Sequence, residues 1–253
     1  MDFLPFEPTT WNIVLVVIAF TAAGLSKGVL GIGIPLISVP LLTGIMHPAL
    51  TISVLAIPIL SSNVWQALEG GRSSVVAKRF WNILVALVIG AGLGAQFLTS
   101  ADPLTAQMVI GVIVILFSLT QFKTLTIPDP GLKEKWLSPV IGFIAGVIGG
   151  IATFFGPVLI PYLISLRLSK DMFVSTIAVL YLMGTLPLFA LLAWKGVLGQ
   201  KELILSAIGT VFVMGGVVVG RKLRNVISQE VFRRGLLILL VIMAFNMIRR
   251  AVM

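Results

Sequence analysis

Three polar side chains capable of binding an anion stand inside apolar segments of the chain. Lys27 lies well within the first apolar run, and Asn63 and Gln66 lie near the end of the third. Residues three apart share one face of a helix, so the two amides point the same way. An ammonium group and amide N–H groups both donate hydrogen bonds to oxyanions. This residue combination predicts a site for a small anion.

Each of these side chains also has a simpler interpretation. A lysine at the centre of a membrane helix costs roughly 2.5–3.5 kcal/mol, and a bound anion or released backbone carbonyls could offset that cost. Lys27 could instead extend to the cytoplasmic surface. The amides of Asn63 and Gln66 could equally bond a neighbouring helix. These alternatives stay open at the level of sequence.

Two glycine- and proline-rich breaks interrupt the apolar runs. They are Gly31-Ile32-Gly33-Ile34-Pro35 and the segment from Gly149-Gly150 to Gly156-Pro157. Proline is favoured in the first turn of a helix, so Pro35 and Pro157 predict the starts of two short helices. Backbone groups freed at such breaks must be buried in protein or line a water-filled cavity. Because helix N-termini attract anions, the paired breaks also predict an anion site.

The candidate substrate-binding residues combine these groups with two hydroxyl-bearing residues of the second half. They are Lys27, Gly31, Gly33, Pro35, Asn63, Gln66, Gly149, Gly150, Thr153, Gly156, Pro157 and Tyr181. A single hydroxyl in a span more often bonds a neighbouring helix. We expect no catalytic residue, metal site or cofactor, because cysteine is absent and the acids fall in loops or at segment ends.

The composition shows which elements must carry these residues. Hydrophobic residues make up 58% of the 253 residues and charged residues 11%, against about 25% charged in soluble domains. So few charges cannot cover a soluble surface, which excludes soluble enzymes and nucleic-acid-binding proteins despite the net charge of +9. The sequence predicts an all-α integral membrane protein with ten helical segments, near 11–30, 34–46, 49–68, 79–99, 104–122, 137–153, 156–166, 172–194, 202–220 and 232–249.

The basic residues predict the orientation in the membrane. Cytoplasmic loops carry an excess of Lys and Arg. If all ten segments cross with the N-terminus outside, most of the 18 Lys and Arg residues fall on cytoplasmic loops. We therefore expect a multi-pass protein of the inner membrane with both termini outside. If the short segments 34–46 and 156–166 are re-entrant, eight spans with both termini inside result, and the charge asymmetry is weaker.

A glycine pattern occurs once in each half of the chain. Gly24-x-x-x-Gly28-x-x-Gly31 recurs as Gly142-x-x-x-Gly146-x-x-Gly149, each followed by a proline and a short segment. Each half is expected to hold a long broken helix, a short helix and three full spans. Five segments is an odd number, so the sequence predicts two inverted repeats, 1–124 and 137–253, joined by a cytoplasmic linker, 125–136. Glycine at this spacing also serves close helix packing.

The same motifs resemble a known family. Gly24-Leu-Ser-Lys27-Gly28-Val-Leu-Gly31-Ile-Gly33, followed by Val39-Pro40-Leu41-Leu42 and Ser62-Asn63-x-x-Gln66, is similar to the first half of the sulfite exporter TauE/SafE family. The run from Gly142 to Gly156-Pro157-x-x-x-Pro161-Tyr162-Leu163 resembles its second half. The resemblance implies an inner-membrane carrier of sulfite, sulfonates or related carboxylate anions. The chain lacks the family's GGG run in both halves, which leaves the substrate open.

The sequence therefore predicts a carrier of small anions that works by alternating access around the paired breaks. An intramembrane enzyme acting on a lipid-linked substrate is one alternative, although its spans would lack carboxylates and histidine. An ion channel is the other. The expected partners are the anion and the lipid bilayer, without nucleic acid. A coupled proton or sodium ion and a homodimer are left open.

Overall fold

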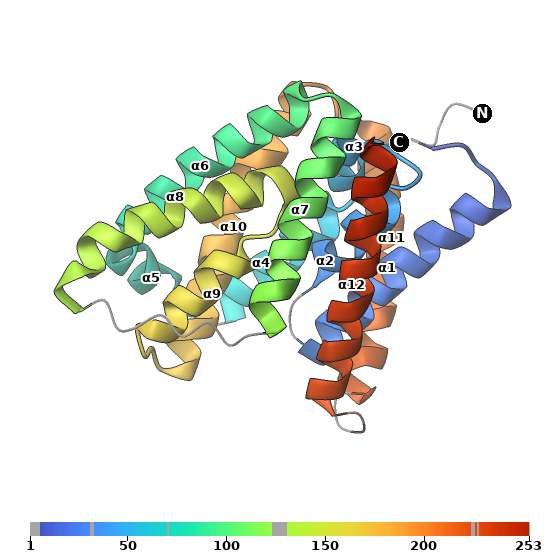
Figure 1. Ribbon diagram of the computed structural model, residues 1–253. Coiled ribbons are helices and arrows are strands. Elements are labelled where there is room, and N and C mark those ends of the chain that lie inside the picture. The colour runs from blue at the N-terminus through green and yellow to red at the C-terminus, as the bar shows by residue number, and fades with distance from the viewer. Residues whose placement is uncertain are drawn as a thin grey trace. The chain divides into compact units, whose positions relative to one another are not determined.

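The computed structural model describes residues 6–30, 33–69, 71–122, 131–223, 226 and 228–252. These residues form helices and no strand. The helices (Figure 1) are α1 (Thr10–Leu30), α2 (Ile34–Leu42), α3 (Pro48–Ser53), α4 (Ala56–Glu69), α5 (Ser73–Arg79), α6 (Trp81–Ser100), α7 (Pro103–Phe122), the 3-10 helix η1 (Gly131–Lys133), α8 (Glu134–Ala152), α9 (Gly156–Ser165), α10 (Lys170–Trp194), α11 (Gln200–Leu223) and α12 (Gln229–Val252).

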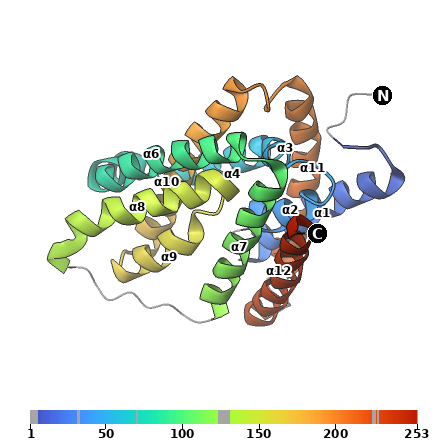
Figure 2. The ribbon, with the colours of Figure 1, turned by 45° about the horizontal axis from the view of Figure 1, so that its top comes forward.

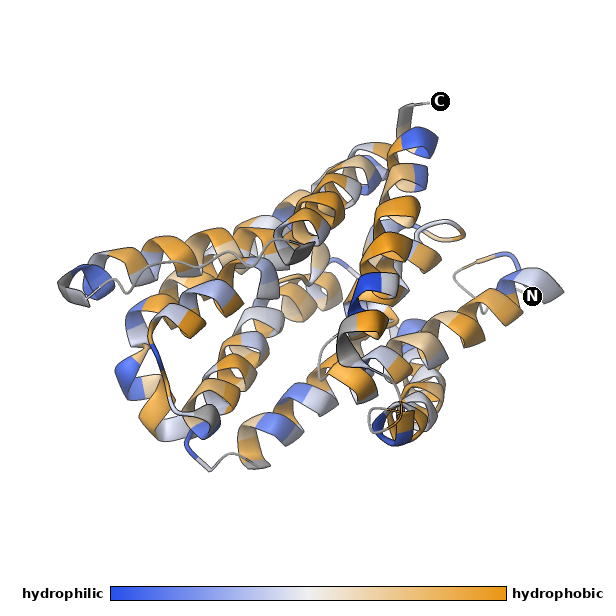
Figure 3. Cartoon of the chain, turned by 60° about the horizontal axis from the view of Figure 1, so that its bottom comes forward, coloured by the Kyte–Doolittle hydropathy of each residue, from blue (hydrophilic) through white to orange (hydrophobic). Residues whose placement is uncertain are grey.

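Seven of the described helices are long and apolar enough to cross a membrane. They are α1, α6, α7, α8, α10, α11 and α12, and α9 is a shorter apolar helix. Hydrophobic residues cover long stretches of the helices, and hydrophilic residues gather mainly toward their ends (Figure 3). The prediction of an all-α, multi-pass membrane protein is confirmed.

One predicted full span is divided in two. The segment expected over 49–68 consists of α3 and α4, which are separated at Val54 and Leu55. Pro58 has no N–H, so it cannot bond the carbonyl of Val54 four residues earlier, and its ring crowds that carbonyl. The amide of Leu55 bonds the carbonyl of Ile52 at 3.1 Å instead. The proline therefore explains the interruption.

The helices form two compact units. Unit 1 comprises Met1–Ile59, Ala101–Phe122 and Ala193–Met253, and unit 2 comprises Leu60–Ser100 and Lys123–Leu192. Unit 1 holds α1, α2, α3, α7, α11 and α12, and unit 2 holds α5, α6, α8, α9 and most of α4 and α10. Each unit thus takes helices from both halves of the sequence.

In unit 1, α1 and α11 run parallel and pack through glycine. A Cβ on Gly24 would lie 2.0 Å from the carbonyl oxygen of Val213, and one on Gly28 would lie 2.5 Å from that of Val217. The residue numbers on the two helices rise together along the interface, which establishes the parallel direction. No larger residue fits at such distances, so the packing role of this glycine pattern is confirmed.

Helix α2 packs on α1, and the end of α12 contacts the segment that follows α2. Helix α2 runs back along α1, because the hydroxyl of Ser38 donates to the carbonyl of Ala19 at 3.4 Å. The guanidinium of Arg250, at the end of α12, donates to the carbonyl of Gly44, just beyond α2, at 3.2 Å. The end of α12 therefore lies beside the segment that follows α2.

Helices α7 and α12 pack in opposite directions within the same unit. The amide of Gln107 donates to the carbonyl of Met247 at 3.5 Å, and a Cβ on Gly111 would lie 3.2 Å from the carbonyl oxygen of Ala244. As the residue numbers rise along α7, those of the contacting residues on α12 fall, so the two helices are antiparallel. Figures 1 and 2 both show this antiparallel pair.

Unit 2 repeats the arrangement of α1, α2 and α11 with other helices. Helices α6 and α8 run parallel, with Cβ positions on Gly142 and Gly146 2.5 Å and 2.3 Å from the carbonyl oxygens of Ile83 and Leu87. Helix α9 runs back along α8, and its Tyr162 hydroxyl bonds that of Ser138. Each unit thus contains a long helix, a break, a short returning helix and a parallel partner packed on glycine.

Candidate functional site

The first break lies in unit 1, between α1 and α2. Helix α1 ends at Leu30, and Lys27 lies half-buried in its last turn. Released carbonyls at a helix C-terminus favour a positive charge there. Gly31 lies outside the described residues. Gly33 precedes α2 with φ 127°, a conformation that suits glycine.

Pro35 occupies the first turn of α2, so the predicted start of the first short helix is confirmed. The amides of Ile34 and Leu36 flank this proline at the helix N-terminus, where the first N–H groups have no intrahelical partner. No side chain in the described part of the chain caps this end of α2. The positive end of the helix dipole therefore points at the break.

The second break lies in unit 2, between α8 and α9, and has the same design. Helix α9 begins at Gly156 with Pro157 in its first turn, as predicted. The amides of Gly156 and Val158 flank the proline, and among the described side chains none caps them. Phe155 precedes α9 as Gly33 precedes α2. Both breaks therefore present an uncapped helix N-terminus with a proline in the first turn.

The helix before the second break ends within one residue of the end predicted for the segment 137–153. Gly149 and Gly150 lie inside α8, which continues to Ala152. Thr153 ends it with φ 62°, and its amide bonds the carbonyl of Gly149 at 2.7 Å. A left-handed conformation is a true outlier for a β-branched residue and costs of order 1–3 kcal/mol. The glycine pair thus lies within the predicted helical segment, and the interruption falls at residues 153–155, inside the predicted glycine- and proline-rich run.

The two glycines serve packing instead. A Cβ on Gly150 would lie 2.3 Å from the carbonyl oxygen of Ala91 on α6. Gly149 faces the ring of Phe155, where a Cβ would lie 2.0 Å from Cε1. The helix continues through both residues because their backbone groups stay within it while their missing side chains admit close neighbours.

Phe155 organises the second break, and the sequence reasoning missed it. Its ring is 1% exposed and lies against Gly149 of α8 and Gly184 of α10. It also packs on the ring of Tyr181, with centroids 5.7 Å apart. A Cβ on Gly156 would lie 2.7 Å from the Tyr181 hydroxyl, so that hydroxyl lies beside the first residue of α9. The sequence signal that could have indicated this contact is the position of Gly149, six residues before Phe155.

Replacement of Phe155 by alanine should destabilise unit 2 by about 3 kcal/mol, because removal of a buried ring leaves a cavity between two glycines. Phe143→Ala is a matched control on α8, since that ring is 40% exposed and should contribute less than about 0.5 kcal/mol. Reversible denaturation in detergent, followed by tryptophan fluorescence, would measure both. Equal losses of stability in the two variants would contradict the organising role of Phe155.

The amide pair lies on the part of α4 that belongs to unit 2. Asn63 is buried, with 6% of its surface exposed. Gln66 is half-buried. Ala67, one turn after Asn63 on the same face, packs in the core with residues of α9 and α10, including Leu159 and Leu180. The Asn63 face of α4 is therefore turned toward the interior of unit 2.

The candidate residues thus fall into two groups. The groups by the second break and on α4 lie in unit 2, and Lys27, Gly33 and Pro35 lie in unit 1. Within unit 2, the Tyr181 hydroxyl lies beside Gly156, the first residue of α9. Hydrogen-bond donors at a helix N-terminus are suited to bind an anion. Over the described ranges, no three His, Asp or Glu side chains form a metal-binding group.

Comparison with known proteins assigns the chain as a whole. A family model for the sulfite exporter TauE/SafE matches residues 16–247. The match runs from the first turns of α1 to the last turns of α12 and includes both breaks. No curated protein and no solved structure matches the chain.

Proposed function

Because the chain belongs to the sulfite exporter TauE/SafE family, we propose that it carries a small sulfur-containing anion, sulfite or a sulfonate, across the membrane. Members of this family are transporters and not enzymes. The intramembrane-enzyme alternative is thereby excluded.

The pair of uncapped half-helix N-termini is the observation that carries this proposal. Each offers two amides beside a proline, at Ile34 and Leu36 in α2 and at Gly156 and Val158 in α9. Such amides bind anion oxygens without carrying a full positive charge. Broken helices of this kind form the substrate sites of many carriers, which work by alternating access. We propose the same mechanism for this chain.

Lys27 and the Tyr181 hydroxyl supply further donors to the breaks. Lys27 adds a full positive charge one turn before the end of α1. Tyr181 places a neutral donor beside Gly156. Both suit the oxygens of a sulfite or sulfonate group, which accept hydrogen bonds and carry negative charge.

Thermal-shift screening of the purified protein against sulfite, sulfonates, carboxylates and phosphate tests the proposed ligand class. A ligand that binds only the folded state raises the unfolding temperature according to its concentration and affinity. We expect sulfite or a sulfonate to give the largest concentration-dependent shift. Stabilisation by carboxylates or phosphate alone would contradict the assignment to sulfur-containing anions.

The helix directions favour ten membrane crossings. Helices α1 and α11 run parallel, and α7 and α12 run antiparallel. Suppose that α3 and α4 together cross the membrane once and that α10 crosses once. The parallel pair α1–α11 and the antiparallel pair α7–α12 can then both form only if α2 and α9 each cross the membrane as well. We therefore propose ten segments as inverted repeats with both termini outside, as the charge distribution predicts.

Single cysteines introduced into this cysteine-free chain would test the topology by labelling with a membrane-impermeant maleimide. Cysteines at Thr9 and His47 should react from outside, and those at Leu168 and Ser228 should react only after the membrane is opened. Opposite accessibility of Thr9 and His47 would show that α2 is re-entrant. External labelling at Leu168 would show the same for α9.

A further inference from the structure

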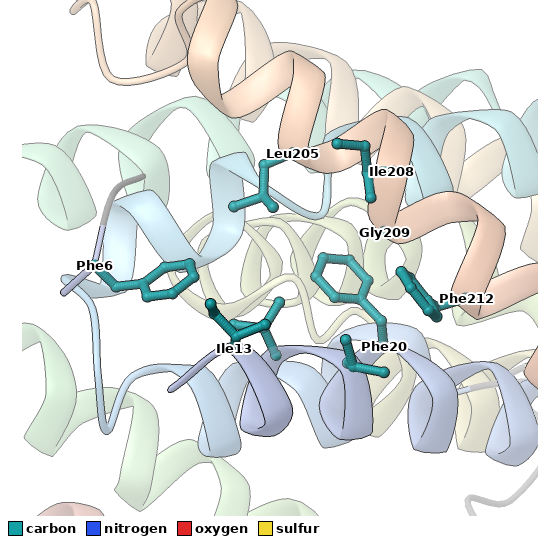
Figure 4. Close-up of a pocket in the computed structure, with 9 residues that line it drawn as sticks. Phe6, Ile13, Phe20, Leu205, Ile208, Gly209 and Phe212 are labelled. Atoms are coloured by element: carbon teal, nitrogen blue, oxygen red, sulfur yellow. The ribbon is translucent and has the colours of Figure 1, made fainter. Parts of the chain in front are cut away.

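An apolar groove lies between α1 and α11 in unit 1, away from the breaks (Figure 4). It has a volume of about 280 Å³. None of its lining residues carries a polar side chain, and they include Phe6, Ile13, Val17, Phe20, Ile208 and Phe212. A groove of this composition offers no hydrogen bond to a polar ligand and favours a hydrocarbon.

The groove forms where the glycine packing of α1 and α11 ends. The backbones touch at Gly216, where a Cβ would lie 2.2 Å from the carbonyl oxygen of Thr21. One turn or more toward the helix starts, the ring of Phe20 lies against Gly209, and larger side chains replace glycine in the interface. The rings of Phe20 and Phe212 bound this end of the groove (Figure 4).

The surroundings place the groove within the hydrocarbon region of the bilayer. Both helices are long and apolar enough to span the membrane. Ile18 on α1 and Val211 on α11 are 50% and 70% exposed, as expected of side chains that face lipid. Trp11 and Lys201 stand exposed at the two helix starts, and such residues mark the membrane–water interface. The groove therefore extends inward from the interface.

We propose that this groove binds one acyl chain of a membrane phospholipid. Its lining carries no polar side chain, which suits an acyl chain rather than a polar headgroup. Phe6 is buried although it precedes α1, and its ring closes the groove near the helix starts (Figure 4). The acyl chain fills the space that the diverging helices leave and keeps their packing surfaces covered.

Photo-crosslinking of the full chain in native membranes tests the proposal. Benzoyl-phenylalanine at Ile208, which lines the groove, should give a monomer carrying the mass of a phospholipid. The same probe at Val211, on the outward face of α11, should give that product at least fivefold less. Equal yields at the two positions would overturn the proposal, because both would then report ordinary surrounding lipid. A covalent dimer from Ile208 would overturn it in favour of a second copy.

A filling variant provides the matched control. Val17→Phe should fill the groove and lower the phospholipid adduct at Ile208 at least fivefold, whereas Val14→Phe, on the exposed side of α1, should leave it unchanged. An undiminished adduct in Val17→Phe, with the unfolding temperature of the parent protein, would also overturn the proposal. If Val17→Phe does not fold, Ile13→Phe fills the same groove, and the comparison of Ile208 with Val211 decides by itself.

Discussion

Replacement of Gly216 by leucine should prevent α1 and α11 from packing, whereas the same change at Gly215 should be tolerated. A Cβ on Gly216 would lie 2.2 Å from the carbonyl oxygen of Thr21, so the backbones must separate. A Cβ on Gly215 meets nothing within 4 Å in the described structure. Overpacking costs about 1–3 kcal/mol and more where backbone must move, so we expect at least about 3 kcal/mol for Gly216→Leu.

Unit 2 offers the same comparison on α6. A Cβ on Gly94 would lie 2.2 Å from the carbonyl oxygen of Val147, and one on Gly92 meets nothing nearby in the described residues. Gly94→Leu should therefore be lost to aggregation or degradation. Gly92→Leu should express normally and gain up to about 1 kcal/mol from helix propensity. Detergent gel filtration and thermal unfolding would measure all four variants.

These glycine variants test whether both units depend on the same packing. Similar stability of Gly216→Leu and Gly215→Leu would contradict the backbone contact between α1 and α11. Similar stability of the α6 pair would contradict the contact between α6 and α8. Loss of stability in the variants of one unit alone would show that the repeated packing is not equally important for the stability of the two units.

The second large effect should be a loss of transport in Lys27→Met. An ammonium that bonds the anion contributes about 1.5–3 kcal/mol as a hydrogen bond to a charged group, so sulfite flux should fall by about 10- to 100-fold. Asn63→Leu removes a buried amide and should also reduce flux. Neither Lys27 nor Asn63 lies at a close helix–helix backbone contact of the kind found at the glycines. The unfolding temperature should therefore change little in both variants.

Two controls separate a binding role from a general effect of charge. Lys195→Met removes a positive charge from an exposed residue after α10 and should leave flux unchanged. Lys27→Arg keeps the charge and should retain more flux than Lys27→Met. Equal flux loss in Lys195→Met and Lys27→Met would indicate that net charge, and not a site at the first break, controls transport.

Much of the helical architecture could be predicted because composition and breakers act locally. Pro35 and Pro157 mark the starts of α2 and α9 because proline is suited to the first turn of a helix. The glycine pattern predicted close packing, and Gly24 and Gly142 both face a partner backbone. Pro58, which divides α3 from α4, was also visible in the sequence, but the division was not predicted from it.

Other features depend on tertiary contacts that no local pattern encodes. Thr153, a β-branched residue, takes the left-handed conformation that glycine would be expected to supply. Phe155 gains its role only because Gly149 and Gly184 lie on either side of its ring. The partners of α1 and α8 could not be read from the repeat either, because each packs on a helix from the other half of the chain.

The most direct test is uptake of radiolabelled sulfite into proteoliposomes that contain equal amounts of folded wild-type or Lys27→Met protein. Wild-type protein should take up sulfite well above protein-free vesicles. Lys27→Met should take up no more than about a tenth as much at an unchanged unfolding temperature. Equal uptake by the two proteins would contradict a binding site at the first break. Sulfite and sulfonate uptake by wild-type protein no greater than in empty vesicles would contradict the proposed substrate class.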